Sequence, residues 1–266
     1  MSRTAPEDWL KICPHLTIGT PFGDPCLSFD ENELEQIAAG LHQRGYFSVP
    51  GRFERQEIAP ILNGMRCLKD HSIPPVYIYL YDQPWFLFEK LKTLLSYILG
   101  EQYALLPNFW AWHLTSAGEQ GWPIHRDCDA QTVFDMGEDR LLMSLSLWIP
   151  LTDVDEQNGC MHVVEYPKEK ALQKAGIEAE DMLKAATALP APAGSVLGWP
   201  QDVLHFGGTY TEQAQNERAS LSFEFQNTAF DPLATPLLDT SSPPPFEQRL
   251  ELLSLQIEKY KHINQG

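Results

Sequence analysis

The sequence predicts a mainly β fold with peripheral helices, in which the strands form a jelly roll or a barrel. Short strand-like segments bounded by turn residues follow one another from Asn108 to about residue 229. Helical periodicity is found mostly outside this region, before residue 108 and again near the C-terminus. With 266 residues, of which 43% are hydrophobic, the chain is long enough to bury one good core, so we expect a single domain.

The N-terminal part is expected to begin with an irregular arm, residues 1–29, which contains four prolines and no clear period. Asp30 and Glu33 are spaced as in a capping box, which predicts a helix that begins there and ends at Gly45. The other elements expected before residue 108 are a short strand at 46–49, helices at 53–70 and 86–99, and a strand at 76–81.

Residues 30–266 are expected to form the domain, with N-terminal helices in 30–107 and the jelly-roll core in 108–229. A helical insert at 168–188 should interrupt the core beside the mouth of the site, and a C-terminal helix should occupy 246–263. The apolar stripe of that last helix favours core packing over a dimer contact. The core strands are expected at 109–115, 141–150, 160–164, 194–199, 205–209 and 218–226.

The composition limits the classes of partner. With 19 basic and 36 acidic residues the net charge is −17, which argues against nucleic acid and against an anionic membrane surface. The charge is typical of a soluble cytoplasmic protein, and the alternative that it attracts a cationic substrate stays open. The five cysteines form no Cys-x-x-Cys pair, as in a reducing compartment. We expect no signal peptide and no membrane span, and therefore a cytoplasmic location.

A His-x-Asp pair, His125 and Asp127, is followed much later by His205. Because residues at i and i+2 of a strand point to the same face, the pair could bind one metal ion. Two imidazoles and one carboxylate are the ligands of a facial triad for non-haem Fe(II), which leaves three coordination positions open. A zinc-dependent hydrolytic site with the same ligands is an alternative, although it leaves the arginine described next unexplained.

Arg218 follows His205 by 13 residues (218 − 205) and stands at the start of an alternating strand. Its guanidinium offers a planar fork of donors that matches a carboxylate. Ser220 lies two residues further, on the same strand face, and could donate a second hydrogen bond to that carboxylate.

The sequence resembles the phytanoyl-CoA dioxygenase-like branch of the Fe(II)/2-oxoglutarate oxygenases over about residues 30–230. The resemblance implies a double-stranded β-helix core (jelly roll, cupin-like), with iron bound by His125, Asp127 and His205. It also implies that Arg218 binds the distal carboxylate of 2-oxoglutarate and that Trp148 lies against this co-substrate. The matching segments, in the order of the family, are Gly45–Gly51, His125–Asp127, Leu147–Asp153, Asn158–Cys160, Gly194–Val196, His205 and Arg218.

Two features bear on the reaction. The family's usual Pro-Gly-Ser-His turn is replaced by Glu165–Lys170, so the substrate of a relative cannot be transferred to this chain. Asp127 is retained, whereas halogenating relatives carry a small residue there, and oxygenation is therefore favoured over halogenation. His113 and His162 could also face the pocket, but a hydrogen-bonded core histidine is the favoured interpretation of each.

The resemblance thus implies a dioxygenase that uses Fe(II), 2-oxoglutarate and dioxygen to hydroxylate an unactivated C–H bond of a small molecule. Succinate and carbon dioxide would be released. The substrate could be free or linked to CoA or a carrier protein, and the protein a monomer or a homodimer. Alternatives are the same iron chemistry with a desaturation, cyclisation or epimerisation outcome, and a non-catalytic metal-binding jelly-roll module.

Overall fold

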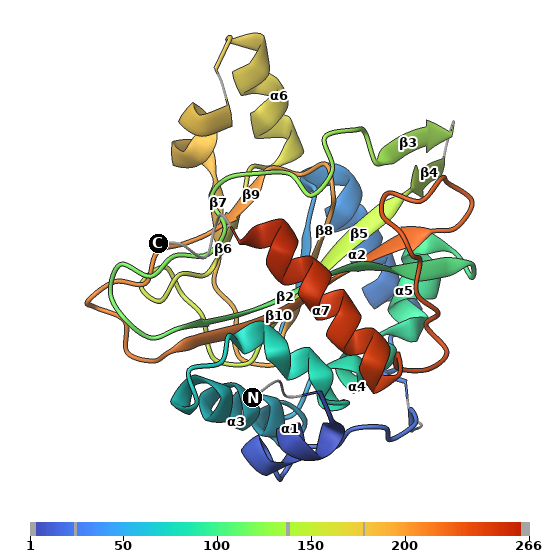
Figure 1. The fold of residues 1–266 in the computed structure, drawn as a ribbon. Coiled ribbons are helices and arrows are strands. Elements are labelled where there is room, and N and C mark those ends of the chain that lie inside the picture. The colour runs from blue at the N-terminus through green and yellow to red at the C-terminus, as the bar shows by residue number, and fades with distance from the viewer. Residues whose placement is uncertain (1–3, 24–25, 137–138, 178, 262–266) are drawn as a thin grey trace.

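The computed structural model describes residues 4–23, 26–136, 139–177 and 179–261. Its largest element is a five-stranded antiparallel sheet in the order β1-β8-β5-β10-β2, beside which lie a three-stranded sheet, β7-β6-β9, and the hairpin β3-β4 (Figure 1). The strands are β1 Phe47–Val49, β2 Tyr103–Leu114, β3 Val133–Met136, β4 Asp139–Leu142, β5 Ser144–Pro150, β6 Met161–Val163, β7 Thr187–Leu189, β8 Val196–Pro200, β9 His205–Gly207 and β10 Arg218–Asn227.

Helices surround the sheets: α1, α3 and α4 gather at one end of the molecule, and α6 projects at the opposite end (Figure 1). The C-terminal helix α7 packs against β2. No helix in the described ranges combines the length and the apolar character needed to cross a bilayer. The helices are α1 Pro6–Ile12, α2 Glu31–Arg44, α3 Arg55–Asp70, the 3-10 helix η1 Pro75–Leu80, α4 Gln83–Glu89, α5 Lys92–Leu99, α6 Tyr166–Lys174, the 3-10 helix η2 Ala179–Ala185, and α7 Phe246–Tyr260.

Strand β10 is an inner strand of the large sheet and pairs with β2 on one side and with β5 on the other. Its side chains alternate between two environments. Leu221, Phe223 and Phe225 belong to the hydrophobic core, where the Phe223 ring meets those of Trp85 and Phe88 from α4. The opposite face of β10 is polar throughout and carries Arg218, Ser220, Ser222 and Glu224.

The expected start and end of the first long helix are confirmed. The Asp30 carboxylate accepts a hydrogen bond from the Glu33 backbone N–H at 2.8 Å, which is the N-cap interaction that the spacing predicts. Gly45 ends α2 with φ 89°, a left-handed conformation that favours glycine. The following strand β1 joins the edge of the large sheet by pairing with β8.

The strand expected at 76–81 is wrong, because this segment forms the 3-10 helix η1. Pro75 opens it, and prolines fit the first turn of a helix but cannot donate to a sheet. The aromatic residues that suggested a strand are core residues here. Tyr79, for example, is fully buried and donates its hydroxyl to the backbone carbonyls of Trp110 and Ser222.

Other boundaries differ in detail. The arm expected to be irregular contains the helix α1, the helix expected at 86–99 is the pair α4 and α5, and the strand expected at 141–150 is divided into β4 and β5. Strands β3 and β7 were not expected, and β2 begins at Tyr103 rather than at 109. The insert at 168–188 is helical, as α6 and η2, and residues 262–263 of the expected C-terminal helix lie outside the described ranges. The sheets do not close into a barrel in the described ranges.

Candidate active site

His125 and His205 face each other across a single antiparallel bridge. The backbone N–H of each donates to the carbonyl oxygen of the other at 3.0 Å. Directly opposed residues of an antiparallel pair point to the same face, so the two imidazoles meet, with ring centroids 4.3 Å apart. His205 begins β9, as expected, but the His-x-Asp pair does not lie on a strand. The chain leaves β9 after His125, because the N–H of Cys128 bonds to the carbonyl of Gln201 instead.

Asp127 completes a cluster of three potential metal ligands. One ligand atom from each of the three residues lies within 4.8 Å of the others. The Nε2 atoms of His125 and His205 are 3.3 Å and 3.6 Å from the Asp127 carboxylate oxygens. The structure therefore brings together all three residues that the sequence nominated, in a set that could hold a divalent metal ion.

Hydrogen bonds to the far side of each ligand fix its orientation. Nδ1 of His125 lies 2.7 Å from the carbonyl of Pro123, and Nδ1 of His205 lies 3.0 Å from that of Val203. Because a carbonyl only accepts, both Nδ1 atoms carry the proton, and both Nε2 atoms keep a lone pair for a metal. The Ser146 hydroxyl, on β5, donates to the Asp127 carboxylate at 2.6 Å. Ser146 was not predicted from the sequence as a residue of the site.

The charges of the cluster also suit a metal ion. Burial lowers the pKa of His205 to about 4, so this imidazole is neutral near pH 7. Burial would raise the pKa of Asp127, but the nearby imidazoles of His205 and His125 and the Ser146 hydrogen bond outweigh it and lower that pKa. Burial would lower the pKa of His125, but the Asp127 carboxylate outweighs it and raises that pKa. A neutral imidazole and an ionised carboxylate are the protonation states that metal binding requires, so His205 and Asp127 already have them and a metal ion would displace a proton from His125.

Arg126 connects the loop that carries His125 and Asp127 with the helical insert. Its guanidinium forms an ion pair with Glu169 of α6 and donates to the carbonyl of Asp202. The Asp202 carboxylate in turn accepts from the Tyr166 hydroxyl at 2.6 Å and from the Thr132 N–H at 3.0 Å. Helix α6 thus stands beside the loop, at the place where the resemblance would have put a Pro-Gly-Ser-His turn.

Arg218 is fully buried, yet most of its donors lack a protein partner. Nη2 lies 3.5 Å from the Met161 sulfur, and the guanidinium carbon lies 5.2 Å from the centre of the Trp148 ring. Among the described residues, no group accepts from Nε or Nη1. Burial lowers the pKa of Arg218 to about 10, so the group remains charged near pH 7. A buried guanidinium with unpaired donors is unfavourable unless an anion joins it.

Two further buried donors in this region have no partner among the described residues: the hydroxyl of Ser220 and Nε1 of Trp199. Trp199, on β8, lies against the His205 ring with a centroid distance of 4.8 Å. Unpaired buried polar atoms are rare in folded proteins, and a group of them indicates a ligand.

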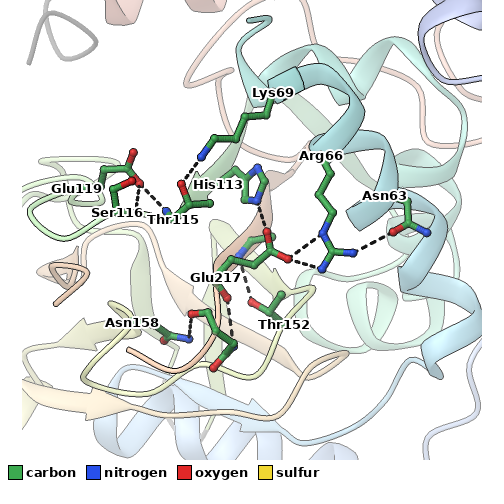
Figure 2. Close-up of polar contacts among 12 residues, drawn as sticks. Asn63, Arg66, Lys69, His113, Thr115, Ser116, Glu119, Thr152, Asn158 and Glu217 are labelled. Carbon is green, nitrogen blue, oxygen red and sulfur yellow. Dashed lines mark hydrogen bonds and ion pairs between the residues drawn. The ribbon is translucent and has the colours of Figure 1, made fainter. Parts of the chain in front are cut away.

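The start of β10 is fixed by the residue before Arg218. Figure 2 shows the Glu217 carboxylate between Arg66 of α3 and His113 of β2, and it lies 2.8 Å from Nε of Arg66 and 2.5 Å from Nε2 of His113. The Thr152 hydroxyl accepts from the N–H of Ala219 at 3.1 Å, immediately after Arg218 (Figure 2). Contacts on both sides of Arg218 therefore hold its backbone. His113 is bonded to Glu217 and is not a described lining residue of the cavity that contains His125, Asp127 and His205.

These side chains surround one cavity of about 260 Å³. Five of the six residues nominated from the sequence line it, namely His125, Asp127, Trp148, His205 and Arg218. Ser220, the sixth, is buried next to Arg218 along β10 but is not one of the described lining residues. The lining residues that the sequence argument did not nominate include Asn108, Trp110, Trp112, Trp122, Ser146, Met161, Trp199, Glu224, Lys259 and Tyr260.

Strand alternation could have identified some of the lining residues that were not predicted. Counting in steps of two along β10 from Arg218 reaches Ser222 and Glu224, and one step back from Trp148 along β5 reaches Ser146. The contribution of α7 had no such signal, because nothing in the sequence places Tyr260 opposite a loop more than a hundred residues earlier.

Comparisons with known proteins agree with this architecture. The epimerase SnoN of nogalamycin biosynthesis is 20% identical, with 80% of this chain and 99% of that chain covered and a TM-score of 0.59. The carbocyclase SnoK of the same biosynthesis is 12% identical, with 83% and 99% covered and a TM-score of 0.56. HygX from Streptomyces hygroscopicus, in a structure with nickel and 2-oxoglutarate bound, is 12% identical, with 76% and 89% covered and a TM-score of 0.54.

The likeness to these solved structures shows the fold, a jelly roll with peripheral helices. No curated protein matches the sequence. The family profile described as phytanoyl-CoA dioxygenase (PhyH) matches residues 69–215, more than half of the chain and the part that holds His125, Asp127 and His205. The chain therefore belongs to the phytanoyl-CoA dioxygenase family.

Proposed function

We propose that the protein is an Fe(II)- and 2-oxoglutarate-dependent oxygenase that hydroxylates an unactivated C–H bond of a small molecule. One observation carries the proposal. The buried, incompletely paired guanidinium of Arg218 lines the same cavity as the cluster of two histidines and one aspartate. A metal site alone would not need this charge, whereas a co-substrate with a metal-binding end and a distal carboxylate uses both.

His125, Asp127 and His205 would hold Fe(II). Two imidazole nitrogens and one carboxylate oxygen on one side of the ion leave positions for other ligands, as in the facial triads of non-haem iron enzymes. The bonds from Nδ1 to backbone carbonyls and from Ser146 to Asp127 keep the three ligands oriented.

Arg218 would pair with the distal carboxylate of 2-oxoglutarate, which would give its unpaired Nε and Nη1 donors an acceptor. Trp148 would flank the co-substrate, since its ring lies next to both the guanidinium and the cavity. The Ser220 hydroxyl, which has no acceptor among the described residues, would donate the second hydrogen bond to that carboxylate.

When bound, iron and 2-oxoglutarate together with dioxygen supply the oxidant through oxidative decarboxylation, and succinate and carbon dioxide are released. The protein positions the co-substrate and the substrate and excludes water from the cavity. The rings of Trp110, Trp112, Trp122 and Tyr260 line the cavity and keep its wall apolar beside the triad. The substrate C–H bond would be held between this wall and the metal.

Epimerisation, ring closure or desaturation by the same iron chemistry is the second candidate. The solved structures with similar folds include proteins described as an epimerase and a carbocyclase. Product mass separates the outcomes, because hydroxylation adds one oxygen atom, desaturation or ring closure removes two hydrogen atoms, and epimerisation leaves the mass unchanged.

The test is an anaerobic titration of the apo-protein with Fe(II) and 2-oxoglutarate, followed by visible absorption. We expect a weak metal-to-ligand charge-transfer band that saturates with one equivalent of each. His125→Ala should abolish the band, because the metal loses a ligand. His71→Ala, which removes an exposed histidine at the end of α3, is the matched control and should keep the band.

If the folded wild-type protein binds Fe(II) tightly but shows no band at saturating 2-oxoglutarate, the co-substrate assignment is wrong. Retention of the full band in His125→Ala would instead remove the triad assignment. Succinate formation in the presence of oxygen then provides the assay for screening substrates.

A further inference from the structure

Glu224 lies on the cavity face of β10, and the proposed chemistry gives it no role. It shares that face with Arg218, six residues earlier, so the two are about 20 Å apart along the strand at about 3.3 Å per residue. Both side chains line the same cavity. A single strand thus places a cation at one end of the cavity and a carboxyl group at the other.

The sheet is irregular at Glu224. The pairing of β10 with β2 shifts register between Phe223, which is opposite Phe109, and Phe225, which is opposite Leu105. Three residues of β2, 106–108, therefore face the single residue Glu224. Bulges next to active sites re-aim side chains, and here Asn108 is directed toward Glu224.

The Glu224 carboxyl group is held on one side only. Asn108 Nδ2 and Gln201 Nε2 donate to the same oxygen, Oε2, at 2.8 Å and 2.7 Å. No cation of the described residues lies within ion-pair distance of Glu224; the Lys259 ammonium donates to Oδ1 of Asn108 at 3.2 Å and acts on Glu224 only through its charge. Burial, and then the charge of Asp127, raises the pKa of Glu224 to about 8. A buried carboxyl group without a counter-charge lowers the stability of the fold, and such groups are often kept because they have a function.

Four aromatic side chains line the same cavity as Glu224, and two of them, Trp110 and Trp112, lie opposite Ser222 and Ser220 of β10. Trp122 is central, with its ring centroid 4.4 Å from that of Tyr260, 5.7 Å from that of Trp110 and 5.8 Å from that of Trp112, each in edge-to-face geometry. Aromatic faces attract cations. The Lys259 ammonium lies 4.9 Å from the centre of the Tyr260 ring, so this ring already takes part in one cation–π contact.

We propose that Glu224, held by Asn108 and Gln201, binds a protonated amine of the substrate, with the Trp110, Trp112, Trp122 and Tyr260 rings packed around the carbon skeleton. The proposal rests on the proposed function, because the bound amine would place the adjacent C–H bonds near the metal. It names the substrate class: a small, largely apolar molecule with one basic nitrogen.

Other head groups fit the cavity less well. A cation would pair with the ionised form of Glu224 and stabilise it, whereas a carboxylate or phosphate would oppose that ionisation and a neutral hydroxyl would bring no charge to pair with it. The net charge of −17 also favours the approach of a cation, because the long-range potential of the protein attracts it.

The experiment compares benzylamine with benzyl alcohol as ligands of the anaerobic Fe(II)–2-oxoglutarate complex, by calorimetry and by the shift of the charge-transfer band. The two probes share the ring and the chain length and differ in the charged head group. We expect benzylamine to bind about ten- to a hundredfold more tightly, as a charged hydrogen bond implies. In Glu224→Gln the ratio of the two affinities should fall close to one, whereas Glu224→Asp should keep part of the preference.

Glu251→Gln is the matched control, because it removes the same charge from an exposed position of α7 and should keep the wild-type ratio. Equal binding of the two probes to the wild type, no binding of benzylamine, or an unchanged preference in Glu224→Gln would each overturn the proposal. The wild-type charge-transfer band separates this failure from failure of the proposed function: without the band, the iron and 2-oxoglutarate assignment itself is wrong.

Discussion

At the scale of single residues, the site is most clearly marked by donors that lack acceptors. Arg218 is buried with Nε and Nη1 unpaired in the described ranges, and its contacts with the Met161 sulfur and the Trp148 ring supply no negative charge. Such an arrangement destabilises the fold, because the guanidinium loses its hydration and gains no negatively charged partner. An anionic ligand bound to Arg218 would offset this loss of stability.

Arg218→Met should therefore separate stability from function. We expect the ligand-free variant to unfold at a higher temperature than the wild type, with a gain of about 1–3 kcal/mol, because an apolar side chain of similar length replaces an unpaired charge. The variant should bind 2-oxoglutarate at least tenfold more weakly. Thermal unfolding with and without 2-oxoglutarate measures both effects. A less stable ligand-free variant would mean that Arg218 serves the fold.

At the scale of elements, two glycines set the distance between β9 and the loop that carries His125 and Asp127. A methyl group on Gly207 would come within 2.8 Å of the Cα of Gly121. This close approach allows the Gly207 N–H to donate to the Trp122 carbonyl at 3.0 Å, next to the bridge between His125 and His205. The backbone contact between Gly121 and Gly207 thus helps to align His125 and His205, two of the three potential ligands.

Gly207→Ala should weaken metal binding although it removes no ligand. The added methyl group must push the loop away from β9, and we expect the Fe(II) affinity to fall about 10- to 100-fold, as for other changes that misplace ligands. Gly23→Ala is the control, since a methyl group there meets nothing within 4 Å. Metal titration of both variants is the measurement, and equal affinities would show that the loop tolerates the displacement.

At the scale of the whole molecule, a buried ion pair joins both ends of the described chain. Asp82, before α4, bonds to Arg249 of α7 at 2.8 Å and accepts from the backbone of Gly19 and Thr20 at 3.1 Å and 2.9 Å. Both charged side chains are almost completely buried. The pair holds α7, and with it the Tyr260 ring, over the cavity.

Asp82→Asn should destabilise the fold by about 3–5 kcal/mol near neutral pH, because the Arg249 charge would remain buried alone. Burial would raise the pKa of Asp82, but the bonds from Thr20 and Arg249 outweigh it and lower that pKa. Its contribution is thus complete above the unfolded value of about 3.9 and is lost as the pH falls through the lower folded value. Urea unfolding should show a constant difference between wild type and variant above about pH 5 and a shrinking one below about pH 4. A difference that did not depend on pH would exclude the ionised carboxylate as its source.

The sequence by itself predicted the fold class, the strands β5, β6, β8, β9 and β10 in chain order, and the three potential metal ligands that the structure brings together. Those inferences depended on local patterns: alternation along β10, a cap at Asp30, and ligand residues at recognisable spacing. Local patterns failed where packing decides. The β-branched residues and tyrosines of residues 76–81 favoured a strand, because burial on all sides and alternation are hard to distinguish in a segment of six residues.

Only the tertiary structure decided what surrounds the triad. The bulge that turns Asn108 toward Glu224, the close approach of Gly121 and Gly207, and the position of Tyr260 all join segments that are far apart in the chain. It also revealed that the Arg218 donors lack protein acceptors, since a missing partner is a property of the packed interior. Sequence spacing indicates which side chains could bind a metal, whereas packing determines which charged side chains lack a protein partner and can bind a small molecule.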